Sequence, residues 1–247
     1  MRRNVVSGLV LATIFTAVLA QELPEFIHVC KRNDPNLGDC IKASVENVKP
    51  HLVHGVPEYS IPSLEPLLLK EVVAAPGNTI KLRLRNVHVY GASNFTVARI
   101  RANIDKLRFL IDLDFRALSI ESDYDIDGKL LLLRIRGSGP MYGNFSDCKG
   151  FVKVQAETTD RPDGKHGVKI VDFKTKIAVG NGKLRLENLF GGDPALGDAI
   201  NMAINTNFDA FIQELQPTLE SAISDTFLSI TNSILTKFTY ESLFPLS

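Results

Sequence analysis

The segment DPALGDAINMAINTNFDAFIQELQPTLESAISDTFLSITNSILTK, residues 193–237, decides the fold. Asp193 suits the N-cap position of a helix, and Pro194 suits its first turn. The pattern after them predicts one helix of about 44 residues and about 65 Å, kinked at Pro217. Large apolar residues recur along it at steps of three and four, with a mean of about 3.8, as on one helix face; they are Ile200, Ile204, Phe208, Phe211, Leu215, Leu219, Ile223, Phe227, Ile230 and Ile234.

Such a helix needs a partner along almost its whole length, because its apolar face would otherwise lie in water. A coiled coil would need a mean step of about 3.5 residues, so a second long helix is not the expected partner. A compact domain of this size has a radius of gyration of only about 17 Å, so a helix of this length must cross it from end to end. The remaining candidate is the set of strands that precedes the helix.

Between residues 79 and 189 the apolar period changes to two, which is typical of strands with one buried and one exposed face. Ile80, Leu82 and Leu84 alternate with basic residues, and the parity changes before Val87. Residues 171–179 alternate in the same way, and Gly180-Asn181-Gly182 after them predicts a hairpin turn. Short turns between strands of this kind favour an antiparallel sheet. We therefore expect an α+β fold in which a strongly curved antiparallel sheet wraps a long C-terminal helix.

The chain upstream of the sheet predicts a short helix followed by an extended segment. Ile41, Val45, Val48 and Leu52 fall at helical spacing, and Gly55 is a stop signal. The stretch GVPEYSIPSLEPLLL, residues 55–69, has three prolines, which prevent a regular helix.

Asp123, Asp125, Asp127 and Gly128 spell the beginning of an EF-hand calcium loop. The twelfth position of that loop should hold a bidentate glutamate, but here it is Arg134, whose guanidinium repels calcium. The sequence therefore predicts no metal site, and a β-turn at residues 125–128 between two strands is the expected structure.

Residues 1–20, MRRNVVSGLVLATIFTAVLA, have the pattern of a secretory signal peptide, with two arginines, an apolar run and small residues before the end. A membrane anchor is the alternative, but the apolar run of about 16 residues is shorter than the roughly 20 needed to span a bilayer. The expected organisation is a signal peptide in residues 1–20 and a single domain in residues 21–247, located outside the cell. The formal net charge of zero does not favour nucleic acid as a partner.

The cysteines fit an oxidising compartment. Cys30 and Cys40 enclose a polar segment and are expected to form a disulfide, worth about 2–3 kcal/mol for so short a loop. Cys148 is then left as a free thiol, buried or half-buried. Asn94 and Asn144 each begin an Asn-x-Ser/Thr acceptor sequence for N-glycosylation.

Several stretches, in this order and spacing, resemble motifs of the insect takeout and juvenile-hormone-binding proteins, and of the takeout branch in particular. The resemblance covers residues 23–245 and implies a fold like the TULIP lipid-binding domains, with the sheet and the long helix around an apolar cavity. It also implies a secreted carrier of a hydrophobic small molecule, such as a juvenile-hormone-like terpenoid or another lipid. The second disulfide of some hormone-binding members is absent. The stretches are CKRNDPNLGDC (30–40), GVPEYSIPSLEPLLL (55–69), VYGASNF (89–95), DYDIDGKLLLLRIRGSG (123–139), LENLFGGDPALGDAIN (186–201) and TKFTYESLFP (236–245).

A carrier needs a lined apolar cavity and one or two polar groups. We expect the middle of the long helix and the apolar face of one strand to line it, with Tyr124 as a polar contact to the ligand; a solid core is the alternative. The expected lining residues are Phe109, Ile111, Leu113, Phe115, Phe208, Phe211, Leu215 and Leu219.

Other functions have less support in the sequence. There is no G-x-S-x-G, H-E-x-x-H or P-loop motif, so we expect no catalytic residues, no cofactor and no metal. His51 and His54 lack an obvious third ligand. A protein that binds phospholipid at membrane surfaces is the alternative function, against which the balanced charge argues. The expected partner is a hydrophobic small molecule, bound by a monomer without a membrane anchor.

Overall fold

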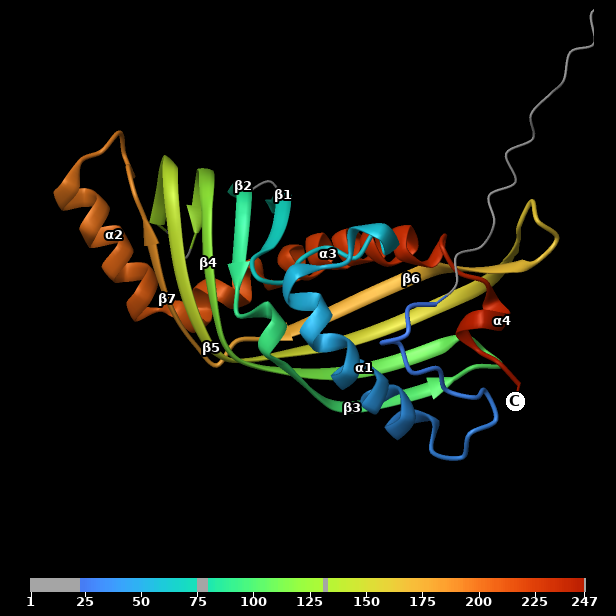
Figure 1. The fold of residues 1–247 in the computed structure, drawn as a ribbon. Coiled ribbons are helices and arrows are strands. Elements are labelled where there is room, and N and C mark those ends of the chain that lie inside the picture. The colour runs from blue at the N-terminus through green and yellow to red at the C-terminus, as the bar shows by residue number, and fades with distance from the viewer. Residues whose placement is uncertain (1–22, 75–79, 131–132, 247) are drawn as a thin grey trace, which may run out of the picture.

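The computed structural model describes residues 23–74, 80–130 and 133–246, so the expected signal peptide lies outside the described residues. Seven antiparallel strands form one curled sheet, flanked by helices (Figure 1). In chain order the elements are α1 (Leu37–His54), the 3-10 turn η1 (Pro57–Tyr59), β1 (Leu67–Ala74), β2 (Ile80–Tyr90), the 3-10 turn η3 (Ala92–Asn94), β3 (Phe95–Asn103), β4 (Arg108–Leu130), β5 (Leu133–Asp160), β6 (His166–Ala178), β7 (Asn181–Leu186), α2 (Pro194–Thr206), α3 (Phe208–Leu235) and α4 (Tyr240–Leu243).

Two long strands, β4 and β5, run the length of the sheet and divide it into two lobes. The first half of β4 pairs with β3 and its second half with β2. The first half of β5 pairs with β7 and its second half with β6. We call the part formed by β1, β2, β7 and the adjoining halves of β4 and β5 the β7 lobe. The part formed by β3, β6 and the other halves is the β6 lobe, and α3 contacts both lobes.

The expected strand patterns hold in detail on β2. Ile80, Leu82 and Leu84 are buried and alternate with exposed basic residues. The pairing of β2 with β4 then shifts by one residue between Arg85 and His88, and Val87 is buried again. A β-bulge is therefore the cause of the parity change in the sequence.

The three aspartates lie in the middle of β4, so the expected β-turn at residues 125–128 is wrong. Asp123, Asp125 and Asp127 are exposed and alternate with buried residues. They stand opposite Arg85, Arg83 and Lys81 of β2, respectively. An alternating acidic row suits this position because opposite charges on neighbouring strands stabilise an antiparallel pair. The connection between β4 and β5 falls at residues 131–132, outside the described residues.

The expected hairpin around Gly180 is also wrong. β6 ends at Ala178 and β7 begins at Asn181, but both strands pair with β5 rather than with each other. The chain therefore passes from the β6 lobe to the β7 lobe at Gly180, and it pairs with β5 both before and after this point.

The single C-terminal helix of the sequence prediction is two helices. Asp193 caps α2 as expected, with its carboxylate accepting the backbone N–H of Leu196 at 3.0 Å. Helix α2 ends at Thr206, and the Nδ2 of its C-cap residue Asn207 donates to the carbonyl of Ala203 at 2.8 Å. α3 begins at Phe208. α3 continues through Pro217. In Figure 1, α2 leans along β7, whereas α3 crosses to the β6 lobe. The apolar step of four continues over the break, so periodicity did not reveal it.

Helix side chains take the place of a neighbouring strand along β7. Asn205 accepts the backbone N–H of Leu184 at 2.8 Å and donates to the carbonyl of the same residue at 2.7 Å. Asn201 makes the same pair of hydrogen bonds with Leu186, each 2.9 Å long. Both asparagines belong to α2, so this helix satisfies the strand edge that faces it.

α3 continues this arrangement along β6. Asn232 binds both the N–H and the carbonyl of Ile170, at 2.8 and 3.0 Å. Ser224 accepts the N–H of Thr175 at 2.9 Å. Helix side chains thus occupy hydrogen-bonding positions that a further strand would otherwise use.

The arrangement includes one buried carboxylate. Glu220 accepts the N–H of Ile177 at 3.0 Å, and Gln216 donates to the Ile177 carbonyl at 2.8 Å. Lys176 Nζ lies 2.6 Å from the second carboxylate oxygen, although the Glu220 side chain is only 5% exposed. Burial alone would raise the pKa of Glu220, but hydrogen bonds from Lys176, Gln216 and Ile177 outweigh it and lower this pKa.

Candidate functional site

The β7 lobe is solidly packed. Its core includes residues from the sheet, from α2 and from the beginning of α3. Ile80 and Tyr124 are 0% exposed, and Ile204 and Leu215 are 2% exposed. A side chain without exposed surface has no room for a ligand beside it. The β7 lobe therefore holds the fold together but offers no apolar cavity around these residues.

This packing corrects part of the expected cavity lining. Phe211 and Leu215 are buried in the β7-lobe core rather than around an open space, whereas Phe208, 7% exposed, lines a groove at the junction of α2 and α3. Tyr124 is buried in the β7-lobe core too, and its hydroxyl donates to the carbonyl of Glu187 at 2.5 Å. Burial, with the nearby charges of Glu187 and Asp125, raises the pKa of Tyr124 to about 12. Tyr124 is thus a satisfied core hydroxyl.

The β6 lobe is packed less closely around its helices. No residue of α1 is fully buried, although its stripe of Ile41, Val45, Val48 and Leu52 is apolar. The second half of α3 repeats the pattern, because Ile223, Phe227, Ile230 and Ile234 are all only half-buried. Leu219 is half-buried too, but it packs against the β7-lobe core. Two helices therefore keep apolar stripes that the protein covers incompletely.

The strand face expected to oppose the helix belongs to the same lobe. Phe109, Ile111, Leu113 and Phe115 are half-buried. Phe109 is in register with Val154 and Phe173 on the next two strands, and Phe173 stacks on Phe227 of α3 with ring centroids 6.2 Å apart. Residues in register across antiparallel strands share a face. This strand face therefore lies on the side of the sheet that faces α3.

An apolar pocket of about 180 Å³ lies at the outer end of this face. Phe109 provides its floor from the sheet, and Leu37 and Ile41 of α1 line it. Leu243 and Phe244 cover it from α4 and the residue after it, and Phe244 stacks on Phe109 at 6.1 Å. The N-terminal segment completes the lining with Leu23, Ile27, His28, Val29 and Cys30, and α1 adds Ser44.

A larger groove, of about 830 Å³, opens at the junction of α2 and α3. Eight of its fourteen lining residues have amide, hydroxyl or charged side chains, among them Asn144, Lys183 and Asn205. An open groove with such mixed walls encloses an apolar molecule less completely than an apolar pocket does. The smaller pocket in the β6 lobe is therefore the candidate site.

The C-terminal segment that covers the pocket is fixed at its far end by Arg32. The Arg32 Nε donates to the carbonyl of Phe244 at 2.8 Å, and its backbone N–H donates to Pro245 at 3.0 Å. The Arg32 guanidinium also lies 4.8 Å from the ring centroid of Tyr240. Arg32 is in the loop closed by the expected disulfide between Cys30 and Cys40, and Cys30 lines the pocket.

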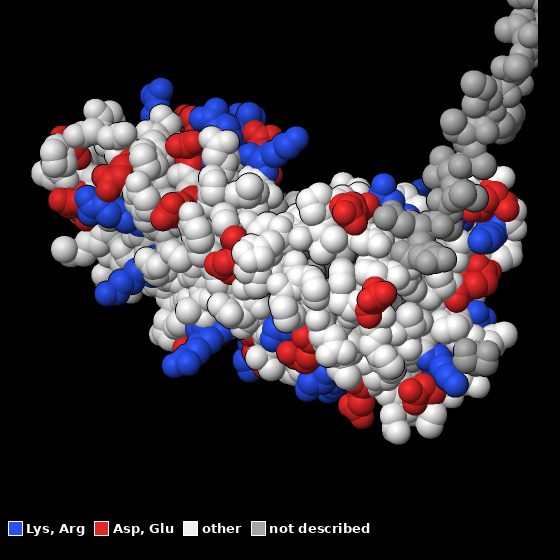
Figure 2. Space-filling view, in the orientation of Figure 1, with Lys and Arg blue, Asp and Glu red and all other residues white. Residues whose placement is uncertain are grey.

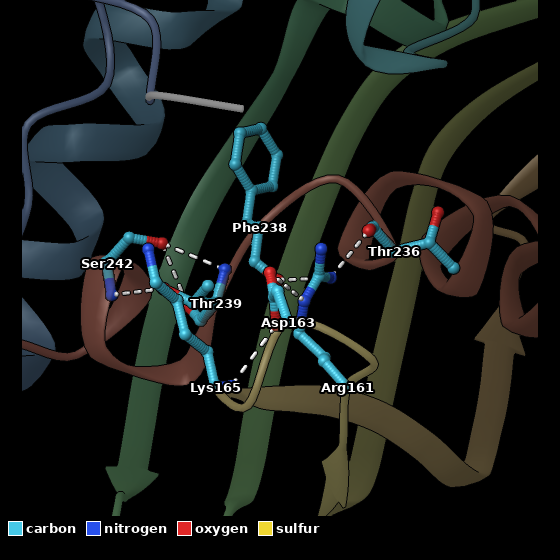
Figure 3. Close-up of polar contacts among 7 residues, drawn as sticks. All are labelled: Arg161, Asp163, Lys165, Thr236, Phe238, Thr239 and Ser242. Carbon is cyan, nitrogen blue, oxygen red and sulfur yellow. Dashed lines mark hydrogen bonds and ion pairs between the residues drawn. The ribbon is translucent and has the colours of Figure 1, made fainter. Parts of the chain in front are cut away.

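Arg161 fixes the near end of the same segment (Figure 3). It lies in the turn between β5 and β6, and its Nη1 donates to the carbonyls of Thr236 and Phe238 at 2.9 and 3.3 Å. Its Nε lies 3.4 Å from Asp163, and the Arg161 side chain is 12% exposed. Thr239 and Ser242 then form a capping box that begins α4. The sequence analysis missed Arg161, because its partners are backbone carbonyls about 75 residues away.

Replacing Arg161 by alanine is expected to lower the free energy of unfolding by about 1–2 kcal/mol, because two carbonyls lose a charged donor. The local effect should be larger: amides of residues 238–244 should exchange hydrogen faster, since α4 is only four residues long. Hydrogen exchange followed by mass spectrometry measures this. Arg161→Lys keeps the charge but not the planar guanidinium, so its exchange rates should be intermediate. Unchanged exchange in Arg161→Ala would contradict this role.

The remaining sequence-predicted residues lie away from the pocket. Asn94 and Asn144 are exposed, the first at the end of η3 and the second on β5, so both acceptor side chains can be reached. Cys148 is a buried free cysteine, and burial raises the pKa of its thiol.

Within residues 23–74, 80–130 and 133–246, no group of three or more His, Cys, Asp or Glu side chains could hold a metal. Among the described helices, none is long and apolar enough to cross a membrane.

Comparison with known proteins agrees with this fold. The chain is 26% identical over 235 residues to the circadian clock-controlled protein daywake of Drosophila melanogaster, covering 91% of this chain and 89% of daywake. It is 20% identical over 223 residues to a proposed beta-carotene-binding protein of Schistocerca gregaria, covering 89% and 88%. Its fold matches the crystal structure of takeout 1 of Epiphyas postvittana with a TM-score of 0.75 and 20% identity, over 88% of this chain and 99% of takeout 1.

The takeout fold expected from the sequence is thereby confirmed: a long curled antiparallel sheet with C-terminal helices. The family model described as haemolymph juvenile hormone binding protein matches residues 9–245, which is nearly the whole chain. The chain therefore belongs to the haemolymph juvenile hormone binding protein family.

Proposed function

We propose that the protein is a secreted carrier that binds a hydrophobic small molecule in the β6 lobe. The observation that carries the proposal is the contrast between the lobes: the β7 lobe has a large filled core, whereas the β6 lobe has a smaller core and keeps half-buried apolar stripes on α1, α3 and β4 around an apolar pocket. An apolar molecule that covers such inward-facing apolar surface removes it from water, and this stabilises the complex.

Pocket size indicates how the ligand lies. At about 180 Å³ the pocket is smaller than the roughly 300–1,000 Å³ of typical small-molecule sites. An elongated ligand would place one end against Phe109 and Phe244 and extend along Ile111, Leu113 and Phe115. Burying about 400 Å² of such a ligand contributes roughly 10 kcal/mol before association costs, which leaves micromolar or tighter affinity.

The comparisons support a carrier of this class. The family is named for binding juvenile hormone, and one relative for binding a carotene, both hydrophobic molecules. The description of the family as haemolymph proteins and the disulfide between Cys30 and Cys40 support secretion. No step of such binding requires catalysis or a cofactor.

Filling the pocket tests the proposal. Ile41→Trp places a large side chain into the 180 Å³ space from α1, so we expect it to lower the affinity for an apolar fluorescent dye at least about tenfold. The fold should survive, with a change in the free energy of unfolding below about 1 kcal/mol, because Ile41 borders open space. Dye titration of delipidated protein and chemical denaturation measure the two quantities.

Leu68→Trp on β1 is the matched control, because Leu68 is 59% exposed and lies outside the pocket. It should bind the dye as the unmodified protein does. Delipidated protein that takes up no dye would overturn the carrier function. Full dye affinity in a folded Ile41→Trp variant would place the ligand elsewhere, for instance in the groove at the junction of α2 and α3.

A further inference from the structure

We propose that the outer face of β3–β6 docks on anionic phospholipid surfaces. The residues that point away from the pocket on these four strands form a grid, because the register aligns them in four rows. From β3 to β6 the rows are Asn103, Arg108, Gln155 and Asp172; Arg101, Leu110, Lys153 and Lys174; Arg99, Asp112, Phe151 and Lys176; and Thr96, Asp114, Lys149 and Ala178. We call this set the outer grid.

The outer grid is positively charged although the chain as a whole has a formal net charge of zero. It holds seven basic side chains, all exposed, and three acidic ones. Glu220 of α3 reaches Lys176 and offsets one more charge, which leaves a surplus of three. Along the lower rim of the molecule in Figure 2, below β3 and β4 of Figure 1, basic and acidic side chains both project. A local surplus of this kind attracts an anionic surface over a distance of about 8–10 Å.

Apolar side chains stand within the charged rows. Phe151 is 43% exposed between Asp112 and Lys176, and Leu110 is 38% exposed between Arg101 and Lys153. Exposed aromatic and aliphatic groups among basic residues are what an interface with lipid headgroups accommodates, since the cations meet phosphates and the apolar groups enter the acyl boundary. An acidic protein or polysaccharide would use the cations but would not need Phe151 and Leu110.

The shape of the outer grid fits a surface better than a chain-like partner. Four strands and four rows span about 15 by 20 Å. Neither the 180 Å³ pocket nor the 830 Å³ groove is lined by any residue of the grid. The same stretch of β4 carries Leu110 and Asp112 outward and Phe109 and Ile111 toward the pocket. Docking would therefore bring the pocket within one sheet thickness of the lipid, although this inference does not depend on the carrier function.

Vesicle binding tests the inference. We expect the protein to sediment with vesicles of phosphatidylcholine containing about 30% phosphatidylserine and not with pure phosphatidylcholine. Lys149→Glu/Lys153→Glu should weaken this binding at least about thirtyfold, since it reverses two charges of the grid. Salt at 1 M, where screening reaches about 3 Å, should release the unmodified protein. Phe151→Ser should weaken binding severalfold at every salt concentration at which the unmodified protein still binds.

The matched control is Lys81→Glu/Lys129→Glu, which makes the same charge change in the β7 lobe and should bind vesicles as before. Uptake of an apolar dye should be equal in all variants, which separates this result from a failure of the carrier function. If the glutamate pair disturbs folding, Lys149→Gln/Lys153→Gln replaces it, with a smaller expected loss. Equal binding by the grid and control variants would overturn the inference. So would binding to an anionic polysaccharide or acidic protein without binding to anionic vesicles.

Discussion

Leu215→Trp is expected to lower the free energy of unfolding by about 3 kcal/mol. Leu215 is 2% exposed and packs in the β7-lobe core together with Ile204 and Phe211. A tryptophan at this position must push side chains off their preferred rotamers or shift α3, because the surrounding space is already filled. Denaturant unfolding monitored by far-ultraviolet circular dichroism measures the loss.

The same type of substitution should behave differently in the two lobes. Ile41→Trp in the β6 lobe should keep its stability and lose ligand, whereas Leu215→Trp should lose stability and, where folded, keep its affinity for ligand. A Leu215→Trp variant of unchanged stability would mean that the apolar space extends into the β7 lobe. Leu215 would then line the cavity, as its place on the helix stripe suggests.

Glu220→Ala is expected to cost about 2–3 kcal/mol of unfolding free energy at neutral pH. The substitution leaves the buried N–H of Ile177 without its acceptor and removes the partner of Lys176. Glu220→Gln is the matched control, since its amide oxygen can still accept from Ile177. It should cost about 1 kcal/mol, because only the ion pair with the exposed lysine is lost. Equal losses in the two variants would contradict a role for the hydrogen bond to β6.

The same carboxylate makes part of the stability dependent on pH. The folded state lowers the pKa of Glu220 below its ordinary value of 4.5. Its contribution is therefore fully present above pH 4.5 and is lost as the pH falls through the lower pKa of the folded state. The unmodified protein should accordingly lose more stability than Glu220→Gln between pH 5 and pH 3. Parallel losses in the two proteins would show that folding does not lower the pKa of Glu220.

Much of the fold could be predicted because the apolar period reports directly on which face is buried. It identified α1, the alternation on β2 and the helical C-terminal region, since each has a single dominant buried face. It could not show the break at Asn207, because the stripe keeps its step of four while the helix axis changes direction. Nor could it show that β4 runs through Asp123–Gly128, because acidic residues at alternate positions suit a strand only when a basic strand lies beside it.

The candidate site was harder to predict for a related reason. Sequence shows that a side chain faces inward, but not whether the space beyond it is filled. Phe109 and Phe211 look alike in the pattern, yet Phe109 lines a pocket and Phe211 is 4% exposed in a solid core. Arg161 gave no signal, because its partners are the backbone carbonyls of Thr236 and Phe238, which follow α3. Whether an inward-facing side chain lies beside a pocket or in a solid core depends on the lobe to which it belongs. The boundary between the lobes is set by pairing between strands that are far apart in the sequence.

The amide, carboxylate and hydroxyl side chains that join the helices to β6 and β7 can reach their partners only because the repeat length of the helix nearly matches that of the strand. Asn201 and Asn205 are four residues apart and bind positions two residues apart on β7, and Glu220 and Ser224 do the same on β6. Four helical residues advance about 6 Å and two strand residues about 6.7 Å, so the two scales nearly coincide. One residue inserted into either helix would rotate every later contact by about 100°. Only an insertion of about four residues in the helix with two in the strand would restore the match, so changes in the lengths of the two elements are coupled.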